Sequence, residues 1–162
     1  MISIQELLDA YEHNLDVLKR QTIGLSQEDS LLQLPFRANC LNWVVGHILT
    51  NRINVLKMLG IEQVLPDVDL SLYYKESEPI LGPGPGVLVL SELLGHLETT
   101  QKQLEAALSR ETPESLQRLA SYSGRPERTL AAWLLFLFYH DCYHLGQTEL
   151  LRQAAGTDDK VV

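Results

Sequence analysis

Three histidines are placed where their side chains could bind one metal ion. His140 and His144 lie four residues apart within residues 138–145, and residues at i and i+4 of an α-helix share one face. His47 lies on the inward face of a separate helical segment and could supply a third ligand. Three protein ligands leave one position for water or substrate, which is the arrangement of catalytic rather than structural metal sites.

The residue pattern alone leaves a second interpretation open, in which the histidines only fill the core. A single histidine on an apolar face, such as His47, is commonly a hydrogen-bonded core residue, and a pair spaced like His140 and His144 also arises by chance. Three of the five histidines lie on inward faces, which favours metal binding, because neutral imidazole is the commonest metal ligand. The other two differ: His13 is expected in solvent, and His96 at a boundary.

The residues between the paired histidines exclude one mechanism. They are Asp141, Cys142 and Tyr143, so the HExxH pattern of zinc proteases, with its glutamate base, is absent. Asp141 should point about 100° away from His140, which favours a structural role or one in orienting an imidazole. Cys142 should lie on the far side of the helix, and we interpret it as an inert thiol, because a reactive cysteine needs thiolate character and access.

Two amides lie one helical turn from the predicted ligands, Asn51 from His47 and Gln147 from His144. Either amide could line the open side of a metal site. The alternative is a buried amide that is hydrogen-bonded to the backbone. The sequence contains no P-loop, no GxGxxG and no Ser-His-Asp arrangement.

Composition limits the classes of partner. The chain has 162 residues, 45% of them apolar, and its 13 Lys and Arg against 21 Asp and Glu give a formal net charge of −8. This balance argues against nucleic acids and anionic membranes as partners. The longest apolar run, residues 130–139, is too short to span a bilayer, and the N-terminal residues do not read as a signal peptide. Cys40 and Cys142 form no CxxC pair, so we expect a cytoplasmic protein with reduced thiols.

Helical periodicity predicts an all-α protein, a four-helix bundle in one domain over residues 1–156. Ser3 and Glu6 form a capping-box pattern at the start of the first helix, and Gly24 is expected to end it. The other three helices are expected from residues 39–42 to 60, over 87–110, and over 128–155 with Gly156 beyond its end. Residues 157–162 read as a loose C-terminal tail, and no strand-like alternation is present.

The connection between the second and third helices, residues 61–86, is unusually long for a compact domain. Proline and glycine alternate in its second half, which argues against regular structure there. Two successive helices that run parallel would require such a connection, because the chain must return along a whole helix. This interpretation predicts up-down-down-up topology with a long crossover between helices 2 and 3. Residues 81–86 could act as a lid or as a plain connector.

The first half of the fourth helix is apolar around its full circumference over residues 130–139. A helix of this kind is buried on more than one side. Because one side faces the bundle, we expect the other to face a second subunit, which predicts a homodimer.

Two segments resemble motifs of the DinB/YfiT-like proteins. Residues 41–48 (LNWVVGHI) are similar to the motif on the second helix of that family. Residues 140–147 (HDCYHLGQ), followed by Leu150, Leu151 and Arg152, are similar to its HxxxHxGQ motif on the fourth helix and the leucine–arginine ending. The resemblance extends over essentially the whole chain, including the helix order and the long connection.

The resemblance implies an up-down-down-up four-helix bundle that is often dimeric. It implies a divalent metal, usually zinc or nickel, bound by three histidines at the positions matched here by His47, His140 and His144. Similar members include thiol-dependent transferases and isomerases that act with bacillithiol, mycothiol or glutathione, and many others have no known activity. The family name refers to damage inducibility and does not imply DNA binding, which the acidic charge opposes.

These observations lead to a hypothesis of a metal-dependent enzyme acting on a small-molecule substrate. A metal in the site would activate a low-molecular-weight thiol or water for attack on an electrophile. No general base accompanies the histidines, which slightly favours thiol transfer over hydrolysis. The rival hypotheses are a non-catalytic metal-binding or stress-response bundle, and a structural dimer with histidines in its core.

Overall fold

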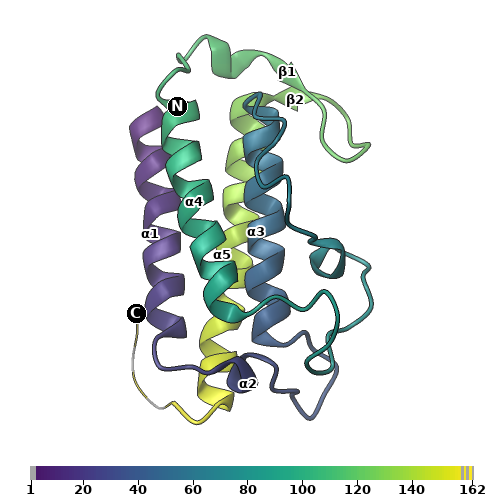
Figure 1. Cartoon of the computed structure of the whole chain (residues 1–162). Coiled ribbons are helices and arrows are strands. Elements are labelled where there is room, and N and C mark those ends of the chain that lie inside the picture. The colour runs from purple at the N-terminus through teal and green to yellow at the C-terminus, as the bar shows by residue number, and fades with distance from the viewer. Residues whose placement is uncertain (1–2, 158, 160, 162) are drawn as a thin grey trace.

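Four long helices form a bundle in the computed structural model, which describes residues 3–157, 159 and 161 (Figure 1). The long helices are α1 (Ile4–Thr22), α3 (Leu41–Met58), α4 (Leu90–Leu108) and α5 (Leu130–Ala154). The short elements are α2 (Gln27–Ser30), η1 (Ser71–Tyr73), η2 (Ser115–Gln117), β1 (Leu119–Ala120) and β2 (Arg128–Thr129). Within the described part of the chain, no helix is both long and apolar enough to cross a membrane.

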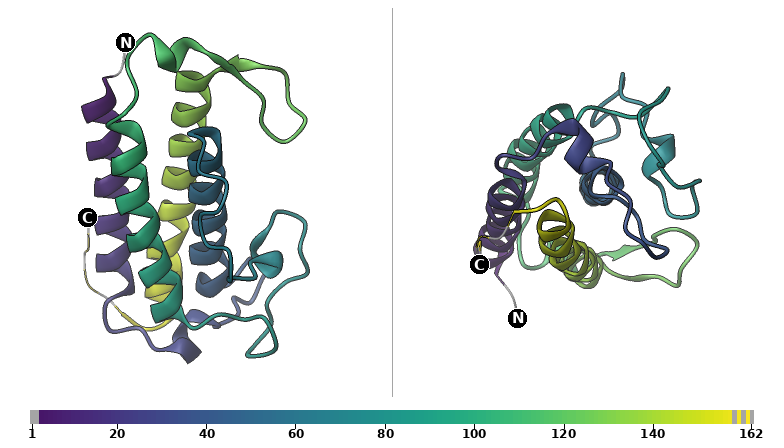
Figure 2. Two further views of the ribbon diagram at one scale, coloured as in Figure 1. Left: turned by 45° about the horizontal axis from the view of Figure 1, so that its top comes forward. Right: turned by 90° about the horizontal axis from the view of Figure 1, so that it is seen from below.

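The helices have the predicted up-down-down-up order. α1 and α5 run in one direction, whereas α3 and α4 run in the other (Figure 1). Both α1 and α3 pack against α4 and α5, so that the four helices surround one core (Figure 2). The all-α fold predicted from periodicity is therefore confirmed.

Local sequence signals explain most helix ends. The Oγ of Ser3 accepts a hydrogen bond from the backbone N–H of Glu6, and the Glu6 carboxylate accepts one from the backbone of Ser3, which is the predicted capping box. Gly156, two residues beyond the end of α5, has φ of 90°, a backbone conformation that glycine adopts without strain. These two ends of the bundle agree with the sequence pattern.

One short element was not predicted from the sequence, in which no strand-like alternation is present. Leu119 pairs with Thr129, and Ala120 with Arg128, in an antiparallel ladder of two residues on each side. α5 consequently begins at Leu130, two residues later than predicted. Strands of two residues are too short to show alternation between apolar and polar side chains, so periodicity cannot detect them.

The tail prediction falls partly on residues 158, 160 and 162, which lie outside the described residues. The Asp159 carboxylate pairs with the Arg152 guanidinium at 2.9 Å. Arg152 is itself buried and donates hydrogen bonds to the carbonyls of Gln21 and Ile23. It thereby supplies donors to carbonyl groups at the C-terminus of α1, where helix carbonyls lack partners within the helix.

The crossover between α3 and α4 follows the outer side of α3 (Figure 1) and is held against it by Tyr73. The fully buried Tyr73 side chain donates a hydrogen bond to Asn42 Oδ1 at 3.0 Å and accepts one from the backbone of Leu88 at 2.8 Å. Its ring lies against Gly46, where a Cβ would overlap the ring atoms. A glycine inside a helix costs stability, and its presence here is explained by this close approach.

Replacing Gly46 by alanine is expected to lower the free energy of unfolding by about 1–3 kcal/mol, because the added methyl group forces the Tyr73 ring out of its site. Denaturant unfolding followed by circular dichroism measures the change. Gly95→Ala is the matched control, since Gly95 is also helical and its Cβ would meet no atom within 4 Å. There we expect a gain of up to about 1 kcal/mol from helix propensity. Equal effects at the two positions would contradict the packing of Tyr73 on Gly46.

Candidate metal centre

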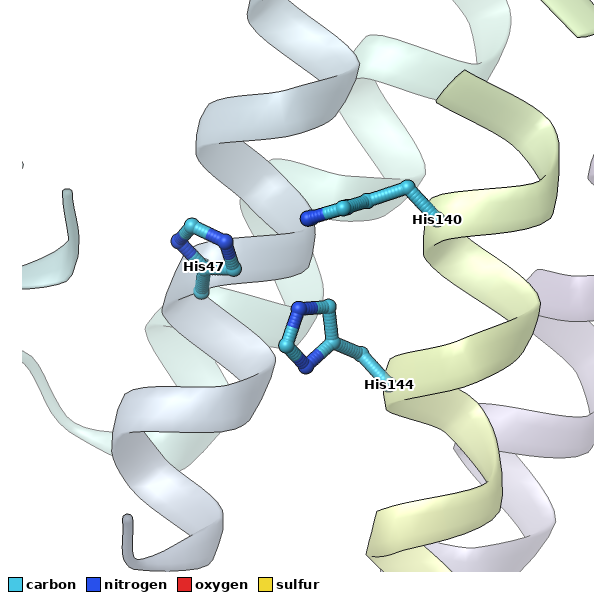
Figure 3. A group of neighbouring side chains, drawn as sticks. All are labelled: His47, His140 and His144. Atoms are coloured by element: carbon cyan, nitrogen blue, oxygen red, sulfur yellow. The ribbon is translucent and has the colours of Figure 1, made fainter. Parts of the chain in front are cut away.

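The structure brings together the three histidines that the sequence analysis singled out. His47 projects from α3, and His140 and His144 project from α5, with their imidazoles directed toward one another (Figure 3). The candidate ligand nitrogens all lie within 4.8 Å of one another. Nitrogens bound to one zinc ion at about 2.1 Å lie roughly 3.4 Å apart. Small side-chain rotations would therefore bring the three nitrogens around a single ion.

His47 is oriented by the crossover. Its Nδ1 lies 2.7 Å from the carbonyl oxygen of Tyr73. A carbonyl only accepts hydrogen bonds, so Nδ1 must carry the proton and Nε2 keeps its lone pair for a ligand. The ring also stacks on Trp43, with centroids 4.5 Å apart and planes 13° apart. The sequence analysis missed Tyr73, although the mid-helical Gly46 beside His47 was a signal for close approach of another chain segment.

His144 is oriented by Gln147 from the next turn of α5. Its Nδ1 lies 2.7 Å from Gln147 Oε1, which accepts a hydrogen bond from Nδ1–H, so that the lone pair of Nε2 stays free. Two roles were predicted as alternatives for Gln147, lining the open side of the metal site or bonding to the backbone. The structure shows a third role, the orientation of His144. Partners of this kind fix the ring and the tautomer of metal-binding histidines.

Replacing Gln147 by alanine is expected to weaken zinc binding about 10- to 100-fold without loss of the fold, because His144 loses its orienting acceptor. Competition with a chromogenic chelator measures the dissociation constant. Gln153→Ala is the control, since Gln153 is an exposed glutamine on the same helix. Unchanged zinc affinity in Gln147→Ala would mean that His144 needs no such partner.

His140 has a different environment from the other two histidines. Neither ring nitrogen forms a hydrogen bond with a described residue, and Nδ1 is buried. An unpartnered buried nitrogen costs free energy, and no acceptor among the described residues orients the His140 ring as Tyr73 and Gln147 orient the other two. The donor set of three imidazoles suits zinc, nickel, copper and iron. The residues present therefore fit a transition-metal ion.

The protonation states also suit metal binding. Burial lowers the pKa of His47, and the hydrogen bond to Tyr73 only partly offsets this. Burial, and then the neighbouring His144 and His47, lower the pKa of His140 to about 4. Burial likewise lowers the pKa of His144. All three imidazoles are therefore neutral near pH 7, which is the form that binds metals.

Asp141 lies outside the cluster, as its position after His140 predicted. It is buried and accepts hydrogen bonds from Asn51 at 2.5 Å and from Arg52 at 3.5 Å. Burial raises the pKa of Asp141 to about 6, while Arg52 and Asn51 act in the opposite direction. Asn51 also donates to the carbonyl of Leu137 at 3.0 Å. These contacts join α3 to α5 directly beside the histidines.

Arg52 was not singled out from the sequence, yet it is 1% exposed. Its Nη1 donates to Gln101 Oε1, and its guanidinium lies 4.5 Å from the ring centroid of Tyr11. An arginine within a largely apolar helical stretch was the available signal, because buried charges are nearly always paired. Asn51 Oδ1 is buried without a partner among the described residues, so the Asn51 amide joins the helices through its nitrogen alone.

The three histidines line a cavity of about 770 Å³, within the usual range for small-molecule sites. Trp43, Asn51 and Phe136 form part of its wall, together with crossover residues 74–76 and hairpin residues 122, 123 and 125. Residues 81–86, considered as a lid, do not line it. Cys142 does not line it either, and its Sγ lies 3.3 Å from Asn14 Nδ2. The cavity, with the histidines in its wall, could admit a small molecule.

Comparison with known protein families matches residues 22–148 to the DinB superfamily. The matched segment includes all three histidines of the cluster. No curated protein shows significant similarity to the chain.

Proposed function

This chain belongs to the DinB superfamily, and on that premise we propose that His47, His140 and His144 bind one divalent transition-metal ion, zinc or nickel. We further propose that the protein is an enzyme that transfers a low-molecular-weight thiol to an electrophilic small molecule. The main support for the proposal is that three neutral imidazoles lie close together in the wall of one cavity. Their orientation by Tyr73 and Gln147 supports it.

The residues around the cavity favour thiol transfer over hydrolysis. When bound, a divalent ion lowers the pKa of a thiol or of water. In the transfer, the thiol sulfur forms a bond to the electrophilic carbon, the leaving group departs with its electron pair, and the thiol proton passes to solvent. Hydrolysis would gain more from a general base. Glu76 is the carboxylate among the described lining residues, and its side chain is exposed and paired with Lys75.

The proposal is tested with zinc- or nickel-loaded protein, a thiol such as glutathione, and 1-chloro-2,4-dinitrobenzene as electrophile. The absorbance of the dinitrophenyl thioether follows its formation, which releases one chloride for each thioether formed. We expect a thiol-dependent rate above that of free metal, which disappears in His140→Ala/His144→Ala. A panel of activated esters tests for hydrolysis. Turnover of an ester without added thiol would mean that the enzyme is a hydrolase rather than a thiol transferase.

The alternative is a non-catalytic bundle that binds metal in a stress response. Stoichiometric metal with no turnover of any thiol–electrophile pair or ester would overturn the enzymatic proposal and leave this alternative. A cytoplasmic location is part of the proposal, because Cys40 and Cys142 are unpaired cysteines of the kind that a reducing compartment preserves.

We also propose that a second copy of the chain covers the outer face of α5. Leu135, Tyr139 and Tyr143 follow one another at intervals of four residues and are exposed, as is Leu150 farther along the helix. An apolar stripe at helical spacing can pack against its own copy across a two-fold axis, and exposed patches of this kind mark interaction sites.

Light scattering after size exclusion measures the mass and tests the dimer. Wild type is expected as a dimer and Tyr139→Glu as a monomer, since a charge in an apolar interface is desolvated without a partner. Leu119→Glu is the control, because Leu119 is equally exposed but lies on β1. A monomeric wild type would overturn the dimer without affecting the metal site.

A further inference from the structure

Arg125 lies in the loop between β1 and β2 and lines the same cavity as the three histidines. The loop turns at Ser123 and Gly124, whose φ values of 50° and 70° are both positive. The backbone N–H of Arg125 then donates to the carbonyl of Tyr122 at 3.0 Å. The guanidinium lies over the Phe136 ring, 5.1 Å from its centroid. The hairpin thus places a cation in the wall of the cavity.

Contacts made by Tyr122 and Ala120 help to hold the hairpin on the bundle. The Tyr122 ring packs on Trp133 with centroids 5.4 Å apart, and the Tyr122 hydroxyl accepts a hydrogen bond from Asn54 at 3.5 Å. Trp133 Nε1 donates to the carbonyl of Ala120 at 2.8 Å. Because these contacts reach both α3 and α5, the position of Arg125 relative to the histidines follows from the fold.

The charges in the cavity wall leave Arg125 uncompensated. The charged lining residues are Lys75, Glu76 and Arg125. Lys75 and Glu76 pair with each other at 3.8 Å, whereas the Arg125 guanidinium makes no ion pair or side-chain hydrogen bond with a described residue. In a chain of net charge −8, this positive cavity favours anionic ligands.

We propose that Arg125 binds the carboxylate of the small molecule that enters the cavity, so that the site selects organic anions with a flat apolar body. This inference rests on the proposed function for the identity of the reacting groups. A guanidinium fits a carboxylate with two parallel hydrogen bonds. The aromatic side chains of Trp43, Tyr122 and Phe136 supply apolar walls for the remainder of the ligand. The carboxylate belongs either to the electrophile or to the thiol.

The test compares probes of equal shape that differ in charge, benzoate against benzamide and 3-mercaptopropionate against 3-mercaptopropionamide. Chemical-shift titration measures each affinity for wild type, Arg125→Gln and Arg128→Gln. Arg128 is the matched control, because it belongs to the same hairpin and stacks on an aromatic ring, Trp133, but does not line the cavity. Benzoate and benzamide are titrated with and without zinc, and the thiol pair with zinc.

We expect wild type and Arg128→Gln to prefer the anion about five- to tenfold in at least one probe pair, and Arg125→Gln to lose that preference. If Arg125→Gln loses the preference for benzoate over benzamide, the carboxylate belongs to the electrophile. If it loses the preference for 3-mercaptopropionate over its amide, the carboxylate belongs to the thiol. An unchanged preference in Arg125→Gln, or none in wild type, would overturn the inference. A preference that depends on zinc but not on Arg125 would assign the carboxylate to the metal. The zinc-free titration needs neither metal nor turnover. It can therefore show carboxylate binding by Arg125 even if the protein proves to have no thiol-transfer activity.

Discussion

Replacing both His140 and His144 by alanine is expected to reduce the metal content from about one ion per chain to none. A single remaining imidazole, His47, cannot hold a transition metal at micromolar concentrations against buffer. Elemental analysis of protein purified without an affinity tag measures the loss directly. Zinc should also raise the melting temperature of wild type and leave that of the double variant unchanged, because only a ligand of the folded state stabilises it.

The chain supplies its own controls for this experiment. His13→Ala and His96→Ala remove histidines that lie outside the cluster, one exposed and one at the boundary of the core, and both variants should bind zinc like wild type. The metal-free double variant should remain folded, because among the described residues His140 forms no hydrogen bond and His144 loses only its bond to Gln147. Absence of metal from wild type, with no uptake of zinc or nickel on titration, would overturn the proposed metal centre. Collapse of wild type on chelation would instead assign the metal a structural role.

Replacing Arg52 by methionine is expected to lower the free energy of unfolding by about 3–5 kcal/mol, because the Asp141 carboxylate then stays buried without its cation. Arg52 and Asp141 are both about 1% exposed, so water cannot replace the missing partner. The loss should extend to the metal centre, since the same contacts join α3 to α5 next to His140. Denaturant unfolding measures the stability, and chelator competition measures the zinc affinity.

Two further variants isolate the cause. Lys19→Met breaks the ion pair with Glu98, in which the two side chains are 46% and 47% exposed, and is expected to cost less than about 1 kcal/mol. Arg52→Met/Asp141→Leu removes both buried charges and should be less destabilised than the sum of its single variants. Equal costs for Arg52→Met and Lys19→Met would show that burial of the Arg52–Asp141 pair has no energetic consequence.

Features that depend on local backbone geometry could be predicted from the sequence alone. The capping pattern at Ser3 and the glycine after α5 mark helix ends within a few residues of chain. The spacing of His140 and His144 places both rings on one face of α5 whatever surrounds it. The long connection after α3 indicated the parallel pair of helices, because no shorter path returns the chain. These inferences use the helical period and chain length alone.

The partners of these residues could not be predicted in the same way, because they come from distant parts of the chain. Tyr73 orients His47 from 26 residues away, Arg52 pairs with Asp141 across 89 residues, and Arg125 reaches the cavity through a hairpin with two-residue strands. Each contact depends on the path of an irregular segment or on the relative placement of two helices. Irregular segments show no sequence periodicity. Their positions depend on burial and hydrogen bonding across the whole core rather than on neighbouring residues in the chain.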